Sequence, residues 1–310
     1  MFKKILYPTK FEEFSLPILQ NITCLRRAGL EEVILLHVID PGNLYTEVDG
    51  GIPIAVDTIR KAITSSIDLM REAASRRLSA YADYLCSEGI KVKTELATGR
   101  VVSEILRTAT ENDVSLIVAG RQKRDVLGEI FVGSTTDRVI RKAKAPILVA
   151  RYHTLRMAGD EVQERFCTDM FRKILYTTDW SPNAERAKMY LPMLRGAGTS
   201  ELVVVHVLEE FANFVDVPYE MKVEALAVAT RNSQDNLDRL TRELEAEGFR
   251  VKASLLCGKP YREIMRVATE ENVSMIVMGS YGKSLMQGIL WGNVSQRVVE
   301  YSEKPVLVVK

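Results

Sequence analysis

Histidine and cysteine are scarce in this chain of 310 residues, which has three of the first and four of the second. The cysteines, Cys24, Cys86, Cys167 and Cys257, show no CxxC spacing. With so few histidines to complete a ligand set, the sequence predicts no zinc cluster. Unclustered cysteines without a disulfide framework favour a reducing compartment, so we expect the protein in the cytoplasm.

The chain also lacks an excess of charge of one sign. It contains 42 Lys and Arg and 41 Asp and Glu, which gives a net charge of +1. No overall field therefore attracts nucleic acid or anionic lipid. No stretch approaches the roughly 20 apolar residues of a membrane span, and the first residues lack the apolar core of a signal peptide. We expect neither a nucleic-acid nor a membrane partner, so any ligand must be recognised by a local site.

The chain does contain a long internal repeat. Residues 2–10 align with residues 171–179 at an offset of 169, and residues 104–120 align with residues 263–279 at an offset of 159. The sequence therefore predicts one domain present twice, at 1–152 and 170–310, with a linker at 153–169. The change of offset places ten extra residues in the first copy, and we expect them as a flap within residues 41–60.

Within each copy, short apolar runs alternate with amphipathic stretches, as is typical of βαβ units with a buried parallel sheet. In the second copy the runs are Lys173–Thr177, Leu202–Val207, Val251–Leu256, Ser274–Met278 and Val306–Val309. Five strands per copy predict a doubly wound α/β fold. Ligands of such folds bind beyond the carboxyl ends of the strands, at the point where the strand order reverses.

Two helices of the second copy are marked by their ends and apolar spacing. Ser181 is a predicted N-cap with Pro182 at the first helical position, and Ala184, Ala187, Leu191 and Leu194 follow at helical spacing. A later stripe of Leu237, Leu240 and Leu244 ends before Gly248, as a matching stripe in the first copy ends before Gly89. We expect both stripes to face the core.

A glycine-rich loop follows the fourth strand of the second copy. Gly279 and Gly282 are separated by two residues, and Gly292 follows nine residues later, at the start of an amphipathic stretch. Glycine leaves main-chain amides accessible to an anion, and a helix start adds unpaired N–H donors. This pattern predicts a phosphate site of micromolar affinity, since a few such contacts must outweigh the cost of association. The alternative is that the glycines only turn the chain.

These motifs resemble the universal stress protein family in its ATP-binding branch. The resemblance rests on the Gly-x2-Gly-x9-Gly spacing, on Thr178 and Asp179 after the first strand, and on a closing strand before Lys310. It covers both copies. It implies two tandem Rossmann-like domains of the adenine nucleotide α-hydrolase type, each with a five-stranded parallel sheet of order 3-2-1-4-5. It further implies that the two domains pair as a dimer within the chain through their last strands. It leaves open whether whole chains also form homo-oligomers.

Carried over residue by residue, the resemblance assigns Asp179 and Thr178 to the nucleoside and the Val207 backbone to the adenine edge. The ligand would be ATP, ADP or AMP, with Mg²⁺ or Mn²⁺ carried on the phosphates and no metal site in the protein. Asn293 departs from the family's preference for Ser or Thr, but its amide can also donate to phosphate. The phosphates would be surrounded by Gly279, Gly282, Gly292, Asn293, Val294 and Ser295.

The first copy differs at two of these positions. Lys10 stands in place of Asp179, and Lys123 stands in place of Gly282, although Gly120, Gly133 and Ser134 persist. A lysine cannot accept a hydrogen bond from a sugar hydroxyl or an adenine amine. We therefore expect the first copy to have lost ordinary ATP binding and to serve structure or regulation. The alternative is that the two lysines bind phosphate as point charges.

No catalytic residue is predicted. Residues 128–134 have the outer spacing of a P-loop but lack its lysine, and neither GxSxG nor HExxH occurs. His37 and His206 occupy equivalent places in the two copies, which favours packing or hydrogen bonding over catalysis. We expect a stress or signalling module that responds to ATP or AMP, with at most slow ATP hydrolysis. The alternatives are a hydrolase or adenylyl-transfer enzyme of the wider group, and a scaffold that binds no nucleotide.

Overall fold

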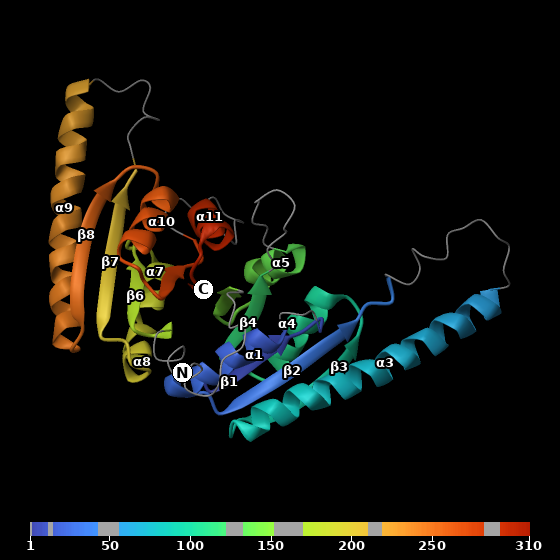
Figure 1. Ribbon diagram of the computed structural model, residues 1–310. Coiled ribbons are helices and arrows are strands. Elements are labelled where there is room, and N and C mark those ends of the chain that lie inside the picture. Colours follow the sequence, from blue (N-terminus) through green and yellow to red (C-terminus); the bar gives the residue numbers. More distant parts are fainter. Residues whose placement is uncertain are drawn as a thin grey trace. The chain divides into compact units, whose positions relative to one another are not determined.

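The computed structural model describes residues 2–11, 15–42, 56–121, 133–151, 170–209, 219–281 and 292–310 (Figure 1). The chain divides into two compact units. The N-terminal unit holds Met1–Gly120 and Gly133–Ala145, and the C-terminal unit holds Arg121–Val132 and Pro146–Lys310. The predicted linker, 153–169, lies outside the described residues.

The N-terminal unit contains a parallel sheet in the order β3-β2-β1-β4. Its strands are β1 (Lys4–Pro8), β2 (Glu32–Ile39), β3 (Lys91–Thr98) and β4 (Leu116–Arg121). Its helices are α1 (Ser15–Cys24), the 3-10 helix η1 (Leu25–Ala28), α3 (Val56–Ser87), α4 (Val101–Glu111) and α5 (Ser134–Lys142). The long α3 lies along β3 and β2 (Figure 1).

The C-terminal unit repeats this plan with the strand order β8-β7-β6-β9-β10, which confirms the predicted order 3-2-1-4-5 for the second copy. Its parallel strands are β6 (Lys173–Thr177), β7 (Glu201–Leu208), β8 (Arg250–Cys257), β9 (Met275–Gly279) and β10 (Val306–Val309). The unit also contains β5 (Ile147–Arg151), which is the last strand of the first copy in the sequence. β5 pairs antiparallel with β10, so that Leu148 lies opposite Leu307. Its helices are α7 (Pro182–Lys188), α8 (Leu191–Gly196), α9 (Tyr219–Ala246), α10 (Pro260–Glu270) and α11 (Asn293–Tyr301).

The predicted helix between the first two strands of the C-terminal unit is two helices in the structure. α7 ends at Lys188 and α8 begins at Leu191, with Pro192 in its first turn. In one continuous helix the Pro192 ring would meet the carbonyl of Lys188 and would leave it without a donor. The break falls between the predicted apolar residues, and all four of them remain buried, as the predicted spacing requires.

The predicted helix ends are confirmed. Ser181 is the N-cap of α7, where its Oγ accepts a hydrogen bond from the Ala184 N–H at 3.2 Å. Gly89 and Gly248 follow α3 and α9 with φ of 74° and 91°, the left-handed conformation that favours glycine. The predicted stripe of Leu237, Leu240 and Leu244 is buried.

The ten extra residues of the first copy do not lie only in a flap. α3 has 32 residues and α9 has 28, so four of the ten lengthen the helix. Within the predicted flap, residues 56–60 form the first turn and a half of α3, while residues 43–55 lie outside the described residues.

Candidate functional site

The carboxyl end of β6 forms a tight turn at Thr178 and Asp179. The Thr178 N–H continues the β6–β7 ladder by donating to the Val205 carbonyl at 3.0 Å. The side-chain oxygens then hold the following residues, because Thr178 Oγ1 accepts from the Trp180 N–H and Asp179 Oδ1 accepts from the Ser181 N–H, each at 3.1 Å. β6 lies between β7 and β9 in the sheet, so this turn stands where the strand order reverses.

A histidine supports this turn in both units. His206 Nδ1 donates to the Thr178 carbonyl at 2.7 Å, and Trp180, at a φ of 62°, places its ring 5.2 Å from the imidazole. The N-terminal unit repeats the arrangement with Phe11 at a φ of 59° and ring centroids 4.4 Å apart. There His37 Nδ1 donates to the Thr9 carbonyl at 2.8 Å.

This shared geometry supports a packing and hydrogen-bonding role for both histidines. Burial lowers the pKa of His37, against the opposing effect of its hydrogen bond to the Thr9 carbonyl, and the nearby charge of Arg77 lowers it further. The neutral ring is therefore favoured. The two aromatic residues at positive φ were not predicted, although they occupy equivalent positions in the repeat and could have been noticed there.

Three hydrogen bonds hold the two ends of the predicted phosphate loop. The Ser280 N–H donates to the Val309 carbonyl at 2.7 Å, and the Gly292 N–H donates to the Ser280 carbonyl at 2.9 Å. The buried Ser295 hydroxyl donates to the Gly279 carbonyl at 2.9 Å. The start of α11 is therefore fixed to the end of β9. Gly282 and the rest of the loop to residue 291 lie outside the described residues.

Gly279 allows a close approach between β9 and α7. A Cβ atom at this position would lie 2.8 Å from the Ala184 nitrogen and 2.8 Å from the Asn183 carbonyl carbon. The buried Asn183 side chain donates to Ser280 Oγ at 3.3 Å and to the Tyr281 carbonyl at 3.4 Å. The start of α7 thus ties the Thr178–Asp179 turn to the loop. Asn183 and Tyr281 escaped the sequence analysis because only their contacts mark them.

The first turn of α11 presents unpaired main-chain amides. Gly292 is its N-cap, and the first intrahelical bond runs from the Gln296 N–H to the Gly292 carbonyl at 3.0 Å. The N–H groups of Asn293, Val294 and Ser295 precede that bond and have no acceptor in the described part of the chain. Free N–H groups at the positive end of a helix dipole can bind an anion.

The predicted site residues thus gather at the carboxyl edge of one sheet. Thr178 and Asp179 follow β6, and Gly279 ends β9, the neighbouring strand. Val207, in β7 on the other side of β6, pairs with Leu256 of β8 and lies one residue before the strand ends. The residues of the α11 start adjoin Gly279 through Ser295.

The N-terminal unit keeps this frame but not its chemistry. Gly133 is the N-cap of α5, which begins at Ser134, and Thr136 Oγ1 lies 3.5 Å from the Gly120 carbonyl in the manner of Ser295 and Gly279. Lys10 is exposed where the C-terminal unit has Asp179. An ammonium group therefore replaces a carboxylate at the turn. Lys123 lies outside the described residues.

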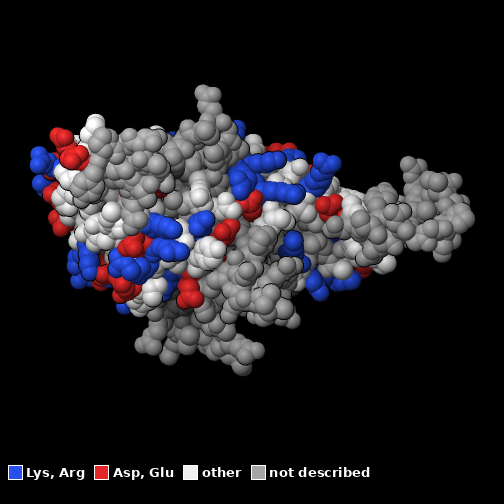
Figure 2. Space-filling view, turned by 90° about the horizontal axis from the view of Figure 1, so that it is seen from above, with Lys and Arg blue, Asp and Glu red and all other residues white. Residues whose placement is uncertain are grey.

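The described residues form no group of three or more His, Cys, Asp or Glu side chains that could hold a metal ion. In the same part of the chain, no helix is long and apolar enough to cross a membrane. On the face seen in Figure 2, acidic and basic side chains lie interspersed rather than gathered by sign.

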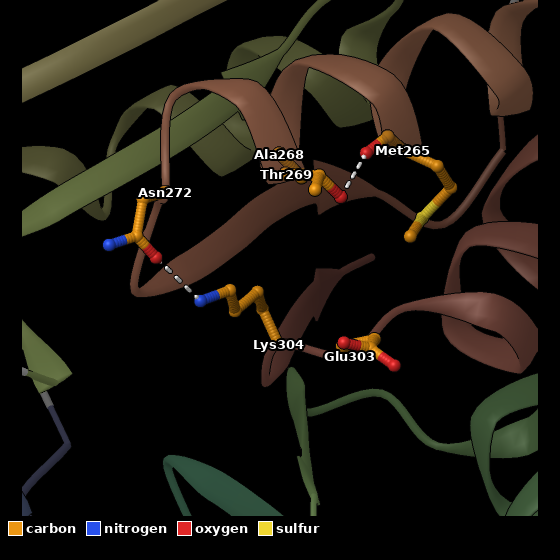
Figure 3. A pocket seen from close by; sticks show the side chains of 6 residues that line it. All are labelled: Met265, Ala268, Thr269, Asn272, Glu303 and Lys304. Atoms are coloured by element: carbon orange, nitrogen blue, oxygen red, sulfur yellow. Dashed lines mark hydrogen bonds between the residues drawn. The ribbon is translucent and has the colours of Figure 1, made fainter.

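A small hollow of the C-terminal unit lies away from the site. It has a volume of about 210 Å³ and opens between the end of α10 and the segment before β10. Lys304 Nζ donates to Asn272 Oδ1 across it at 3.1 Å (Figure 3). These segments precede β9 and β10, so the hollow lies at the amino ends of the strands. Its lining residues are Met265, Ala268, Thr269, Asn272, Glu303 and Lys304.

Known proteins match this chain in the two copies that the internal repeat defines. The profile of the universal stress protein family matches residues 1–151 and 170–310. A universal stress protein of Methanocaldococcus jannaschii is 34% identical over 155 residues, which is 46% of this chain and 96% of that protein. One of Mycobacterium tuberculosis is 23% identical over 257 residues, covering 82% of this chain and 77% of that protein.

A solved structure shares the fold over the whole length. The crystal structure of a universal stress protein from Archaeoglobus fulgidus has a TM-score of 0.70 at 24% identity, with 99% of this chain and 96% of that chain covered. The repeated domain, its strand order and both profile matches lead to one conclusion: the chain belongs to the universal stress protein family and carries two tandem copies of the family's domain.

Proposed function

We propose that the second domain binds ATP or AMP and that the protein is a nucleotide-responsive stress or signalling module. One observation carries the proposal: the unpaired N–H groups at the start of α11 lie at the same carboxyl edge of the sheet as the Thr178–Asp179 turn, where the strand order reverses. Main-chain donors suit phosphate, and a carboxylate suits the hydroxyl groups of a sugar.

Different residues contact different parts of the nucleotide. Asp179 accepts from the nucleoside beside Thr178, and the Val207 backbone contacts the adenine edge. Gly279, Gly282, Gly292, Asn293 and Val294 surround the phosphates. Ser295 contributes its N–H group, because its hydroxyl is engaged by the Gly279 carbonyl. Mg²⁺ or Mn²⁺ is carried by the phosphates.

The turn also contains a buried donor. The Trp180 Nε1 atom is buried without a hydrogen-bond partner in the described structure. An unpaired buried N–H group costs free energy, typically about 1–3 kcal/mol.

The tandem arrangement serves to pair the two domains through their last strands, as a dimer within one chain. The antiparallel pairing of β5 with β10 supports this part of the proposal, since β5 is the last strand of the first copy. Nucleotide bound in the second domain would then alter what the paired domains bind.

Titration calorimetry with ATP on the full chain tests the proposal. We expect one site per chain with micromolar affinity, and two equivalent sites would refute the asymmetry between the domains. The variant Asp179→Asn retains an oxygen for the Ser181 N–H while replacing the other acceptor with a donor. It should weaken ATP binding at least tenfold, whereas Lys10→Asn, the matched change in the first domain, should leave binding unchanged.

The same preparations separate a module from an enzyme. We expect adenine nucleotide to be released from the freshly purified protein, as detected by mass spectrometry, and negligible turnover of added ATP. Substantial metal-dependent turnover that disappears in Asp179→Asn would instead identify an enzyme.

A further inference from the structure

Two arginines converge on one tyrosine between α10 and α11, and the ring of this Tyr261 also lies 6.3 Å from the ring of Tyr301, the last residue of α11. The Arg297 guanidinium carbon lies 4.7 Å from the centre of the Tyr261 ring, and that of Arg262 lies 5.9 Å from it. Arg262 Nε donates to the Tyr261 hydroxyl oxygen at 3.0 Å. Tyr261 and Arg262 belong to the first turn of α10, and Arg297 belongs to α11, which lies next to it (Figure 1).

Among the described residues, no carboxylate neutralises the charges of these two arginines. In the described part of the chain, neither Arg262 nor Arg297 forms an ion pair, and both are exposed. Arg266, one turn further along α10, differs because it binds Glu263 and Glu270, each at 2.7 Å. The hydrogen bond from Arg262 and the charge of Arg297 also lower the pKa of the Tyr261 phenol. The surroundings of Tyr261 therefore favour an anion.

Arg297 connects this cluster to the predicted phosphate site. Its Nε donates to Asn293 Oδ1 at 3.1 Å. Because a guanidinium has only donors, the oxygen of the Asn293 amide must face it, and the remaining hydrogen-bonding atoms of that amide are two N–H donors. Asn293 is the first residue of α11, where the main-chain amides are unpaired. The unpaired main-chain groups of this first turn are thus all donors, and the Asn293 amide adds two more.

The distance between Asn293 and Arg297 suits a chain of phosphates rather than a single phosphate. Asn293 and Arg297 are four residues apart, which is about 6 Å along the helix axis. A single phosphate at the start of α11 uses the main-chain amides. Additional phosphates can extend along the helix toward the two guanidinium groups, whose planar donors match phosphate oxygens in pairs.

The first domain lacks two of the three residues of this cluster. At the offset of 159, Val102 and Ser103 occupy the positions of Tyr261 and Arg262, while Arg138 aligns with Arg297. The copy that has Lys10 in place of Asp179 therefore also lacks the tyrosine and one of the arginines. Both differences fall at the carboxyl edge of the sheet, as expected if they concern one ligand.

We propose that Arg262 and Arg297 bind the terminal phosphate of a nucleoside triphosphate, so that the second domain prefers ATP to AMP. This inference rests on the proposed nucleotide site. Arg262 acts directly on the phosphate, whereas Arg297 also orients the Asn293 amide. The arginine pair thus makes occupancy of the domain depend on the ratio of triphosphate to monophosphate.

The test compares ATP and AMP binding to the full chain by titration calorimetry. The variant Arg262→Met is the sharper one, because it leaves the Arg297–Asn293 hydrogen bond in place. We expect wild type to bind ATP more tightly than AMP, and Arg262→Met to lose roughly tenfold in ATP affinity with AMP affinity unchanged. The double variant with Arg297→Met should bind ATP no more tightly than AMP.

Arg266→Met is the matched control, since it removes an equal charge from α10 at a residue already paired with carboxylates. It should keep the wild-type preference, with thermal unfolding confirming that each variant is folded. An ATP to AMP ratio that is unchanged in Arg262→Met and in the double variant overturns the arginine site while leaving nucleotide binding intact. A wild-type protein that binds neither nucleotide overturns the proposed function as well.

Discussion

Gly279→Ala places a methyl group between β9 and α7. The new Cβ atom would lie 2.8 Å from two main-chain atoms, the Ala184 nitrogen and the Asn183 carbonyl carbon, closer than real Cβ contacts come. Backbone cannot rotate away as a side-chain end can, so α7 must shift. We expect this shift to separate the Thr178–Asp179 turn from the loop, because Ser181 and Asn183 make the connecting hydrogen bonds.

The expected loss of stability is about 1–3 kcal/mol, the usual cost of overpacking a well-filled site. Two other glycines provide controls. In Gly120→Ala the new Cβ would meet only the end of the Ile18 side chain, at 2.5 Å, so the cost should be smaller. In Gly196→Ala it would meet nothing within 4 Å, and this variant should be up to about 1 kcal/mol more stable than wild type.

Urea unfolding followed by tryptophan fluorescence measures these effects in one half of the chain. The sequence contains two tryptophans, Trp180 and Trp291, and both belong to the second copy. Gly279→Ala should lower the transition midpoint of this signal and weaken ATP binding, whereas Gly120→Ala should leave the signal nearly unchanged. Equal stability of Gly279→Ala and wild type would refute the close approach as the reason for glycine.

Three further predictions concern side-chain hydrogen bonds. Ser181→Ala removes the N-cap of α7 and should lower the free energy of unfolding of the second domain by about 1 kcal/mol, while Ser181→Asp, also a good cap, should restore most of it in the same urea assay. Ser295→Ala removes the buried bond to the Gly279 carbonyl and should cost about 1–3 kcal/mol, with weaker binding of ATP; normal stability would show that this bond does not fix α11. Since the pKa of His37 is lowered on folding from its usual 6.5, the unfolded chain binds more protons below that pH, and stability should fall as the pH decreases through 6.5 toward the folded pKa. When the free energy of unfolding is measured from pH 5 to pH 8, it should decrease less steeply with falling pH in His37→Gln than in wild type. An equally steep decrease in the variant would exclude His37 as its source.

Much of the fold could be read from local patterns. The strands Lys173–Thr177 and Val306–Val309 have their predicted bounds, and the other three strands predicted in the second copy differ by one residue at each end. The cap at Ser181 and the glycine after α9 were also predicted. These features depend on neighbours in the sequence, since burial periodicity and cap hydrogen bonds act within a few residues.

The candidate site could be predicted only in part. Sequence spacing placed Thr178, Asp179 and Gly279 at the ends of adjacent strands, because parallel strands share one carboxyl edge. It also assigned Gly279 to phosphate approach alone, whereas the structure gives that glycine a packing role against α7. The ligand roles of Asp179 and Asn293 are proposals, which the binding measurements described above test.

The sequence by itself determined the duplication, the family, the strand order that the family implies, and the loss of the carboxylate at Lys10. Tertiary structure alone decided which distant groups meet, such as the Asn183 side chain with the Tyr281 carbonyl and the Arg297 guanidinium with the Tyr261 ring. The physical reason is that periodicity and capping are short-range along the chain. Close approach, hydrogen bonding and uncompensated charge depend on distances in space, which are set only when the helices have packed onto the sheet.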